Sequence, residues 1–342
     1  MLTAGGVALP SAAEVLEQLE LAGLPERPFP NDGWSGASLT VVERGGDRFV
    51  LKRDSPARDW IARATLDGPL LREAWFAAAG PPLPGPIARP YLGVGRDGEE
   101  FLLVTPDLTG ILIEWEAPVD EATLDGVLDA LARLHRAPPS AAAGDEPDRA
   151  PWCPLPERLL LTSRPFATRY LAQGGAAATS GARLLAGWEA FERHAPVEAR
   201  RLVHDLVTDI RPLVTALESE PAALLHGDLK LANVGIAGDG SVPAVDWQMV
   251  MLGPVALELG WFLVSNSASL PLPPDIVLER YRALAPLAER STDLAWICGL
   301  LLRGWRKGLD AEARAPLASG LPGSDDLAAW CRNALDAAAR VL

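Results

Sequence analysis

The chain has 342 residues, 49% of them hydrophobic and 22% charged, and this balance predicts a globular protein rather than a disordered one. Its 45 acidic and 31 basic residues give a formal net charge of −14, which argues against DNA or RNA as a partner, because an acidic surface repels a phosphate backbone. The length is sufficient for two lobes with a cleft between them.

The cysteines and the apolar segments predict a cytoplasmic protein without a membrane partner. The three cysteines, Cys153, Cys298 and Cys331, lie far apart and form no CxxC pair, so neither a disulfide framework nor a zinc site is expected. Residues 1–24 have no basic segment and are typical of a capped amphipathic helix rather than of a signal peptide. The longest apolar run, residues 294–302, is too short to span a bilayer. The oligomeric state stays open.

The first third of the chain is rich in predicted strands. Residues 38–53 contain two β-rich runs joined by a turn with two glycines, which is typical of a hairpin, and a Gly/Ser loop at residues 31–38 precedes them. Residues 69–79 have helical spacing and end at a Gly-Pro-Pro stop. A second hairpin is expected from residues 87–95 and 99–108. We therefore expect five strands and one main helix in residues 1–108.

Helical patterns dominate the remainder of the chain. Asp120 is expected to cap a helix whose leucines recur at three- and four-residue spacing. Residues 138–150 and 172–182 predict loops, and residues 196–219 predict helix. Beyond Pro254 the pattern is mostly helical. The sequence thus predicts an α+β, protein kinase-like two-lobe fold, with a small β-rich lobe at residues 1–108 and a larger α-rich lobe at residues 109–342.

The segment that carries the chemistry is residues 226–234, HGDLKLANV, followed by AVDW at residues 244–247. Transfer of a phosphoryl group from ATP needs a carboxylate that orients or deprotonates the acceptor hydroxyl, and oxygen ligands that hold Mg²⁺ against the phosphates. Asp228 and Asn233 stand five residues apart, as in the catalytic loop H-x-D-x-x-x-x-N. Asp228 is therefore the candidate catalytic carboxylate.

Asn233 and Asp246 are the candidate ligands of Mg²⁺. This ion prefers hard oxygen donors and keeps several water ligands. One amide oxygen and one carboxylate from the protein are therefore sufficient to bind it. Residues 234–245 predict a hairpin with its turn at residues 238–240, which would bring both side chains to the same end. Taken singly, each motif is as compatible with an ordinary turn as with a site, but the ordered string favours the site.

HGDLKLANV followed by VDWQ resembles the aminoglycoside phosphotransferase and choline kinase-like family, whose pattern is H-G-D-x-x-x-x-N followed by a strand that ends in D-W or D-F. The LARLH sequence at residues 131–135 also resembles a helix ending of that family. The resemblance implies a kinase-like fold, ATP or GTP as phosphate donor, Mg²⁺, and a small hydroxylated acceptor.

Lysine is rare in this chain, which has only Lys52, Lys230 and Lys307. Lys52 falls in the second strand of the first hairpin, where a compact charge can hold nucleotide phosphate oxygens, and Glu73 on the following helix is its expected ion-pair partner. The alternative is a surface lysine and a surface glutamate. Arg72, beside Glu73, is expected to be solvated.

Two loops are expected to add nucleotide contacts. Backbone N–H groups of the Gly/Ser loop, which contains Gly33, Ser35 and Gly36, are expected to cover the phosphates. This loop departs from the G-x-G-x-x-G of protein kinases, and Gly/Ser turns are common. Thr105 and Asp107 fall where the lobes join, and the backbone there is expected to meet the adenine edge.

Lys230 and Glu258 are expected to support the candidate catalytic carboxylate. Lys230 follows Asp228 by two residues and is interpreted as a catalytic, transition-state cation, with a solvated loop residue as the alternative. Glu258 stands where the family pattern G-x-P-x-x-D-L has an Asp that braces the catalytic loop, and its longer side chain leaves this role open. Three histidines are interpreted as structural or surface residues: His135, His194 and His204.

The acceptor is expected over the α-rich lobe. Residues 300–307 are its candidate wall, and a buried core helix with a basic outer edge is the equal alternative. If Arg303 or Arg306 faces the cleft, the acceptor should carry an anionic or strongly hydrogen-accepting group. If acids such as Asp310 and Glu312 face it, a cationic acceptor is favoured, because opposite charge offsets the cost of desolvation.

Three functions compete. The leading hypothesis is an ATP- or GTP-dependent phosphotransferase acting on a hydroxyl of an aminoglycoside-, sugar- or amino-alcohol-like molecule, in antibiotic resistance or in metabolism. A protein kinase is disfavoured, because Gly227 replaces the Arg of H-R-D and no A-P-E segment follows Asp246. A pseudokinase acting as a binding module is disfavoured, because each ionisable position that the chemistry needs is filled.

Overall fold

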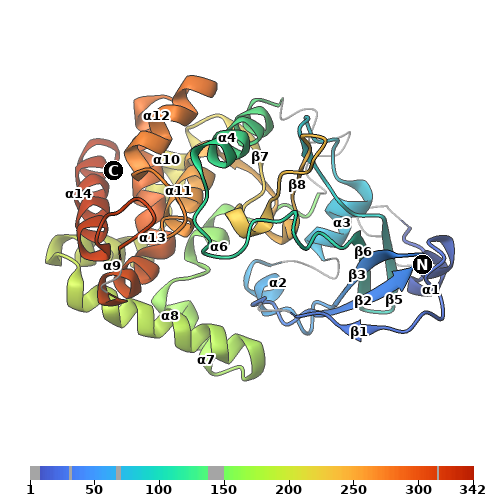
Figure 1. Cartoon of the computed structure of the whole chain (residues 1–342). Helices are drawn as coiled ribbons and strands as arrows, with labels where there is room; N and C mark the ends of the chain where they lie inside the picture. Colours follow the sequence, from blue (N-terminus) through green and yellow to red (C-terminus); the bar gives the residue numbers. More distant parts are fainter. Residues whose placement is uncertain (1–7, 31–32, 67–70, 138–149, 314–315) are drawn as a thin grey trace.

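The computed structural model describes residues 8–30, 33–66, 71–137, 150–313 and 316–342. An antiparallel sheet lies at one end of the molecule, near the N-terminus, and a group of helices fills the other end, near the C-terminus (Figure 1). The α+β fold predicted from the sequence is confirmed.

The sheet has five strands in the order β1-β2-β3-β6-β5. They are β1 (Arg27–Pro28), β2 (Ser38–Arg44), β3 (Asp47–Asp54), β5 (Gly93–Asp97) and β6 (Glu100–Pro106). β2 and β3 pair as the first predicted hairpin, and β5 and β6 pair as the second. The pairing of β3 with β6 joins the two hairpins into one sheet.

One helix covers each face of this sheet. Along β6, Leu102 and Val104 pack toward α1 (Ala12–Gln18), whereas Phe101 and Leu103 pack toward α3 (Arg72–Ala79). This alternation follows from the two-residue period of a strand. Ser11 and Glu14 form a capping box at the start of α1, as expected for a capped helix. The predicted helix 69–79 is confirmed from Arg72 onward, and its first two residues lie outside the described part.

Residues 87–95, expected as one strand, form two separate elements. β4 (Ile87–Ala88) leaves the sheet and pairs in parallel with β8 (Val242–Pro243). Pro90 explains the break, because a proline has no N–H with which to continue a ladder. A short helix, α2 (Trp60–Ala64), was also not predicted.

Helices dominate the chain after β6, as predicted. They are α4 (Glu121–Arg136), α6 (Leu155–Leu160), α7 (Arg164–Leu171), α8 (Gly175–His194), α9 (Val197–Thr208), α10 (Arg211–Glu218), α11 (Val255–Ser265), α12 (Pro274–Leu284), α13 (Glu289–Ala313) and α14 (Gly323–Val341). A two-stranded ladder of β7 (Ala222–Leu225) and β9 (Met251–Pro254) lies among them. Asp120 caps α4 by accepting a hydrogen bond of 2.8 Å from the Thr123 N–H, as expected.

The loop predicted at residues 172–182 is wrong, because α8 begins at Gly175. The small residues that suggested a linker instead allow close helix packing. A Cβ atom at Gly181 would lie 2.6 Å from the Leu171 nitrogen, so only glycine lets α8 approach α7 so closely. Most of the other predicted loop, residues 138–150, lies outside the described part.

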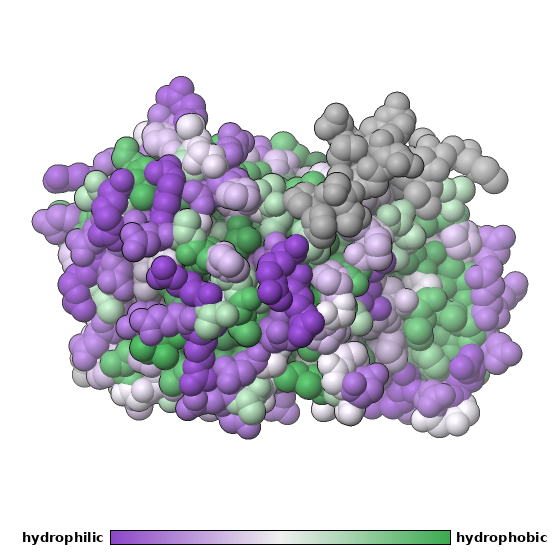
Figure 2. Space-filling model, turned by 90° about the horizontal axis from the view of Figure 1, so that it is seen from above, coloured by the Kyte–Doolittle hydropathy of each residue, from purple (hydrophilic) through white to green (hydrophobic). Residues whose placement is uncertain are grey.

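Helix α13 forms the centre of the larger core and packs against α8, α11 and α14. Figure 2 shows one face of the molecule on which hydrophilic and hydrophobic residues are interspersed. Among the residues that the structure describes, no helix is long and apolar enough to cross a membrane.

Candidate functional site

The candidate catalytic segment, residues 226–233, follows the end of β7 and is called the HGD loop below. Gly227 has φ +80°, and a Cβ atom there would lie 1.9 Å from the carbonyl oxygen of Met249. A side chain of any kind is therefore excluded at this position. This explains in physical terms why glycine stands where protein kinases have arginine.

The His226 ring connects the HGD loop to the strand that leads to Asp246. Its Nδ1 atom accepts a hydrogen bond of 3.3 Å from the Asp228 N–H. Its Nε2 atom therefore carries the hydrogen, which is donated to the Val245 carbonyl at 2.9 Å. The ring also lies 4.4 Å from the ring of Trp247. The histidine thus orients Asp228 relative to the segment that bears Asp246.

Glu258 braces the HGD loop from α11. One of its carboxylate oxygens accepts the Gly227 N–H at 2.6 Å and the other accepts the His226 N–H at 3.2 Å. The second oxygen also lies 2.8 Å from His135 Nε2, and the opposite nitrogen of that ring lies 2.8 Å from the Tyr281 hydroxyl. Burial by itself raises the pKa of Glu258, but His135, His226 and the Gly227 N–H together outweigh this effect and hold the pKa below its ordinary value. Glu258 therefore braces the HGD loop despite its longer side chain, a role that the sequence left open. His135 is structural, as predicted.

Asp228 is 6% exposed, and its two carboxylate oxygens differ in their contacts. Its Oδ2 atom lies 3.2 Å from Lys230 Nζ, whose ammonium is 5.7 Å from the Trp115 ring. Its Oδ1 atom is buried and has no hydrogen-bond partner among the described residues. The Asn233 amide donates to the Asp228 carbonyl at 2.8 Å, which closes the loop. An unpaired buried carboxylate oxygen is costly, so this atom is available for a hydroxyl donor.

Lys52 and Glu73 are brought together, as the sequence predicted. Lys52 Nζ lies 2.6 Å from Glu73 Oε2 and 3.1 Å from Asp246 Oδ1, so one ammonium joins β3, α3 and the Asp246 segment. Burial by itself lowers the pKa of Lys52, but Asp246 and Glu73 outweigh it and raise this pKa well above its ordinary value. The Tyr91 hydroxyl donates to the other oxygen of Glu73 at 2.7 Å. Nothing in the sequence pattern pointed to Tyr91.

Asp246 has a backbone that few residues other than glycine adopt. Its φ of 64° and ψ of 52° lie in the left-handed region, which is uncommon for an aspartate outside special sites. Burial by itself raises the pKa of Asp246, but Lys52 and Lys230 outweigh it and hold this pKa below the ordinary value of 3.8. The carboxylate is therefore ionised over a wide pH range and is suited to hold a cation.

The hairpin predicted between Asn233 and Asp246 is present in outline. Val234 bridges Ala244 in antiparallel fashion, and the Val245 N–H donates to the Asn233 carbonyl at 2.9 Å. The Asn233 side-chain oxygen makes no hydrogen bond to the described residues. An amide oxygen and an ionised carboxylate are hard donors of the kind that Mg²⁺ prefers, so the residues fit this ion. Among the described residues there is no group of three or more His, Cys, Asp or Glu that could hold a metal.

Arg72 is buried, and the expectation of a solvated side chain is wrong. Its guanidinium donates to the Gln248 carbonyl at 2.8 Å and to the Thr65 hydroxyl at 3.2 Å. Only 1% of the residue is exposed. The arginine satisfies carbonyl groups that would otherwise be buried without a donor, and it ties α3 to the segment after Asp246.

The Gly/Ser loop contacts the helical part of the molecule. Ser35 Oγ accepts a local hydrogen bond of 3.3 Å from the Ala37 N–H. Gly36 lies close to Arg58 and Ala176, and the Trp34 ring lies 5.9 Å from the ring of Trp305 on α13. The loop containing Gly33, Ser35 and Gly36 therefore spans from β2 to α8 and α13.

Thr105 and Asp107 are not brought to Lys52 by their side chains. Thr105 lies in the β3–β6 ladder opposite Val50. The Asp107 carboxylate accepts from the Thr109 N–H at 2.9 Å and lies 3.0 Å from an Arg48 nitrogen. The side chain of Asp107 is therefore engaged away from Lys52, and the expected contact of this backbone with a nucleotide stays a prediction.

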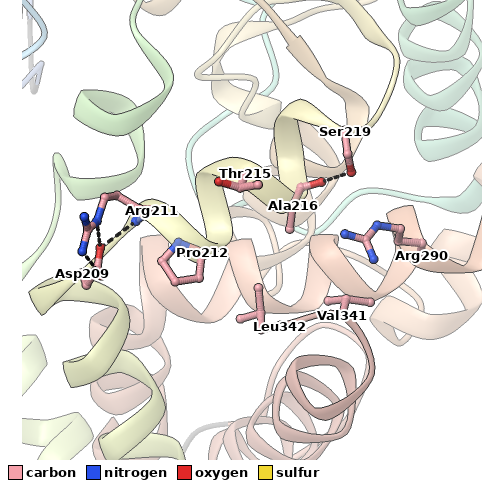
Figure 3. A pocket seen from close by; sticks show the side chains of 9 residues that line it. All are labelled: Asp209, Arg211, Pro212, Thr215, Ala216, Ser219, Arg290, Val341 and Leu342. Atoms are coloured by element: carbon pink, nitrogen blue, oxygen red, sulfur yellow. Dashed lines mark hydrogen bonds and ion pairs between the residues drawn. The ribbon is translucent and has the colours of Figure 1, made fainter.

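A surface groove of about 570 Å³ lies elsewhere, between α10 and the end of α14 (Figure 3). An exposed ion pair of 2.7 Å between Arg211 and Asp209 forms one end of it, and Leu342 lies on its floor. None of the predicted site residues lines this groove, so we do not assign the chemistry to it.

The antiparallel sheet, the helical C-terminal part and the HGD loop between them define a kinase-like protein. The chain belongs to the phosphotransferase enzyme family, whose model matches residues 27–330. It is therefore a small-molecule phosphotransferase, as the sequence predicted. No curated protein matches the chain in sequence.

Two solved structures with a TM-score of 0.50 support the fold. A choline/ethanolamine kinase family protein from Mesorhizobium loti is 17% identical, with a TM-score of 0.50 over 95% of this chain and 96% of the other. The choline kinase LicA from Streptococcus pneumoniae is 10% identical, with a TM-score of 0.50 over 94% and 98%. A spectinomycin phosphotransferase, solved in complex with ADP and spectinomycin, is 12% identical, with a TM-score of 0.47 over 96% and 97%.

Proposed function

We propose that the chain transfers the γ-phosphate of ATP, or of GTP, to a hydroxyl group of a small molecule. The observation that carries the proposal is the Lys52 ammonium, held between Glu73 at 2.6 Å and Asp246 at 3.1 Å. This arrangement joins residues from the sheet, from α3 and from the segment after the HGD loop. It presents a cation and a carboxylate together, which is what a nucleotide with its metal ion requires.

In this proposal Asp228 acts on the acceptor. Its unpaired Oδ1 atom accepts the hydrogen of the acceptor hydroxyl. The new bond forms between the hydroxyl oxygen and the γ-phosphorus as the bond to the bridging oxygen of the nucleoside diphosphate breaks. The proton passes to the Asp228 carboxylate. Lys230, 3.2 Å from Asp228, offsets the charge that develops on the transferred group.

The residues proposed to bind the phosphate donor are Asn233, Asp246, Lys52 and the Gly/Ser loop. Asn233 and Asp246 hold Mg²⁺, which when bound neutralises charge on the phosphate oxygens. Lys52 holds phosphate oxygens, and Glu73 fixes Lys52. Backbone N–H groups of the Gly/Ser loop cover the phosphates, and the backbone at Thr105 and Asp107 meets the base.

In the same proposal, residues 1–108 form the nucleotide-binding lobe and residues 109–342 the catalytic and acceptor-binding lobe. The nucleotide lies between the two lobes.

The experiment that tests the function is a screen for ADP formation. The protein with Mg²⁺-ATP is offered aminoglycosides, macrolides, sugars, amino sugars, amino alcohols and hydroxy acids, and ADP release is compared with the rate without acceptor. At least one class should stimulate release above that background. Failure of the protein to bind Mg²⁺-ATP by calorimetry would contradict the proposal irrespective of the acceptor.

A further inference from the structure

Two arginines are buried beside the HGD loop without a carboxylate partner. Arg158 is fully buried, donates to the Gly227 carbonyl at 2.7 Å, and has two terminal nitrogens without a hydrogen-bond partner. Arg303 is 4% exposed, donates to the Ser265 hydroxyl at 3.2 Å, and has an unpartnered Nε atom. Their guanidinium carbons lie 4.2 and 5.1 Å from the centre of the Trp261 ring, and neither arginine forms an ion pair with the described residues.

Burial of an unpaired guanidinium is costly, so an ion-pair partner for it would be stabilising. Burial, together with the neighbouring cations Arg306 and Arg183, lowers the pKa of Arg303 to about 9, although Asp228 and Asp310 act in the opposite direction. Arg303 also interrupts α13, because its φ of −140° and ψ of 21° are not helical. A break in the helix and a buried charge without an ion pair at one residue indicate that the position is not optimised for stability.

Arg303 lies on the acceptor side of the HGD loop. It donates to Ser265, and the adjacent Asn266 side chain accepts the Leu231 N–H at 2.9 Å, three residues from Asp228. The charges of Asp228 and Arg303 also attract one another. One donor atom without a partner, Arg303 Nε, and one acceptor atom without a partner, Asp228 Oδ1, are therefore both buried near the HGD loop.

The acids near this helix are already neutralised. Asp310 and Glu116 both pair with Arg306, at 2.8 and 2.6 Å. Glu312 pairs instead with the exposed Arg193. Asp310 keeps one buried oxygen, Oδ2, without a partner, but its carboxylate is already in an ion pair with Arg306, whereas Arg303 has no ion pair among the described residues.

The surroundings add positive charge and aromatic surface. Lys230 lies beside Trp115, and the exposed Arg183 lies 5.4 Å from the Trp34 ring, which packs on α13 through Trp305. Together with Arg158, Arg303 and Arg306 these residues make five cations. Five carboxylates oppose them, those of Asp228, Asp246, Glu258, Asp310 and Glu116. These charges balance, so the unpartnered guanidinium nitrogens, rather than a net positive charge, distinguish this side.

We propose that the acceptor is a hydroxylated oxyanion, with its hydroxyl at Asp228 and its carboxylate, phosphate or sulfate group at Arg303. The proposal rests on the phosphotransferase function proposed above and narrows its substrate class. An oxyanion supplies the ion pair that Arg303 lacks and satisfies its free Nε atom, whereas a cationic group leaves both without a partner.

The first test uses inorganic sulfate as the probe and does not depend on turnover. Calorimetric titration at constant ionic strength compares the wild type with Arg303→Met, Lys52→Met and Arg193→Met. Sulfate should bind to the wild type, and Arg303→Met should weaken one site at least tenfold. Lys52→Met, which alters only the donor side, should keep that site, and the surface variant Arg193→Met should match the wild type.

Two measurements separate an effect on folding from the loss of the Arg303 charge. Arg303→Met should unfold at the same temperature as the wild type or above it, because replacement of an unpaired buried charge by an apolar side chain is neutral or stabilising. Arg303→Lys should keep part of the sulfate affinity, because it retains the charge without the fork of donors. Absence of any sulfate site that depends on Arg303 overturns the proposal.

The second test compares acceptors that differ only in charge: glucuronate, glucose and glucosamine, and glycerate against glycerol. The acids should stimulate ADP formation most, and Arg303→Met should raise their KM roughly 10- to 100-fold with little change in the KM of ATP, as for loss of a charged hydrogen bond. Turnover that is best with amines and unaffected by Arg303→Met keeps the phosphotransferase function and refutes the oxyanion. Arg303-dependent sulfate binding in a protein that does not bind Mg²⁺-ATP refutes the function and keeps the anion site.

Discussion

Replacement of Glu258 by glutamine should weaken both the fold and the HGD loop. The carboxylate accepts the Gly227 N–H at 2.6 Å and the His226 N–H at 3.2 Å, and it is 1% exposed. Glutamine has one oxygen in place of two, so its NH₂ group must face at least one backbone N–H. Each buried donor left without an acceptor costs about 1–3 kcal/mol. Together with the lost contact to His135, at 2.8 Å, we expect a loss of roughly 2–5 kcal/mol in the free energy of unfolding.

Urea unfolding and steady-state turnover measure the two consequences of this change. A displacement of the loop by about 1 Å can lower turnover roughly 100-fold, so kcat should fall as well as stability. Glu312→Gln is the matched control, since its exposed carboxylate pairs with Arg193 on the surface and should change stability by less than about 1 kcal/mol. Equal urea midpoints and equal kcat for Glu258→Gln and the wild type would refute this account of the brace.

The pH dependence of stability gives an independent check on Glu258. Its folded-state pKa lies below its ordinary value of 4.5, because His135, His226 and the Gly227 N–H together outweigh the effect of burial. A depressed pKa adds stability that is fully present above the ordinary pKa and is lost as the pH falls through the folded pKa. The stability of the wild type should therefore fall more steeply below about pH 5 than that of Glu258→Gln.

Three further predictions concern the donor side and the loop. Asp246→Ala should weaken Mg²⁺-nucleotide binding more than Asn233→Ala, because only Asp246 brings a formal charge to the ion. Calorimetry with and without Mg²⁺ measures the two affinities, and equal values for the two variants would contradict this prediction. Lys52 and Glu73 should give a non-additive double-mutant cycle on kcat/KM, since their atoms lie 2.6 Å apart, whereas additive losses would mean that the pair does not act together. Gly227→Ala should lower the urea midpoint strongly, because its Cβ atom would lie 1.9 Å from a backbone oxygen, and an unchanged midpoint would show that the loop can shift.

The parts of the fold that local pattern determines were predicted well. Both N-terminal hairpins and the helix at α3 follow from strand alternation, turn residues and a Gly-Pro-Pro stop. The segment at residues 172–182 was misread, because small residues favour both linkers and close helix contacts. Only the tertiary structure distinguishes the two, as the contact of Gly181 with Leu171 does.

In the candidate site, too, residues positioned by local sequence were predictable, whereas residues positioned by long-range packing were not. The spacing of Asp228, Asn233 and Asp246 could be read from the sequence, because a short loop and hairpin determine their positions. Tyr91 and Arg158 could not, since they reach the site through long-range packing that no periodicity records. The burial of Arg72 was missed for the same reason: its partners lie far away along the chain.

The most direct test of the central claim is the Asp228→Asn variant, measured for phosphoryl transfer and for nucleotide binding in parallel. The amide retains the shape of the side chain but cannot accept a proton, so transfer should fall by about 10²–10⁴. Asp228 is not among the residues assigned to the nucleotide, so Mg²⁺-ATP should still raise the melting temperature by nearly as much as in the wild type. Turnover close to that of the wild type would contradict the assignment of Asp228 as the catalytic carboxylate.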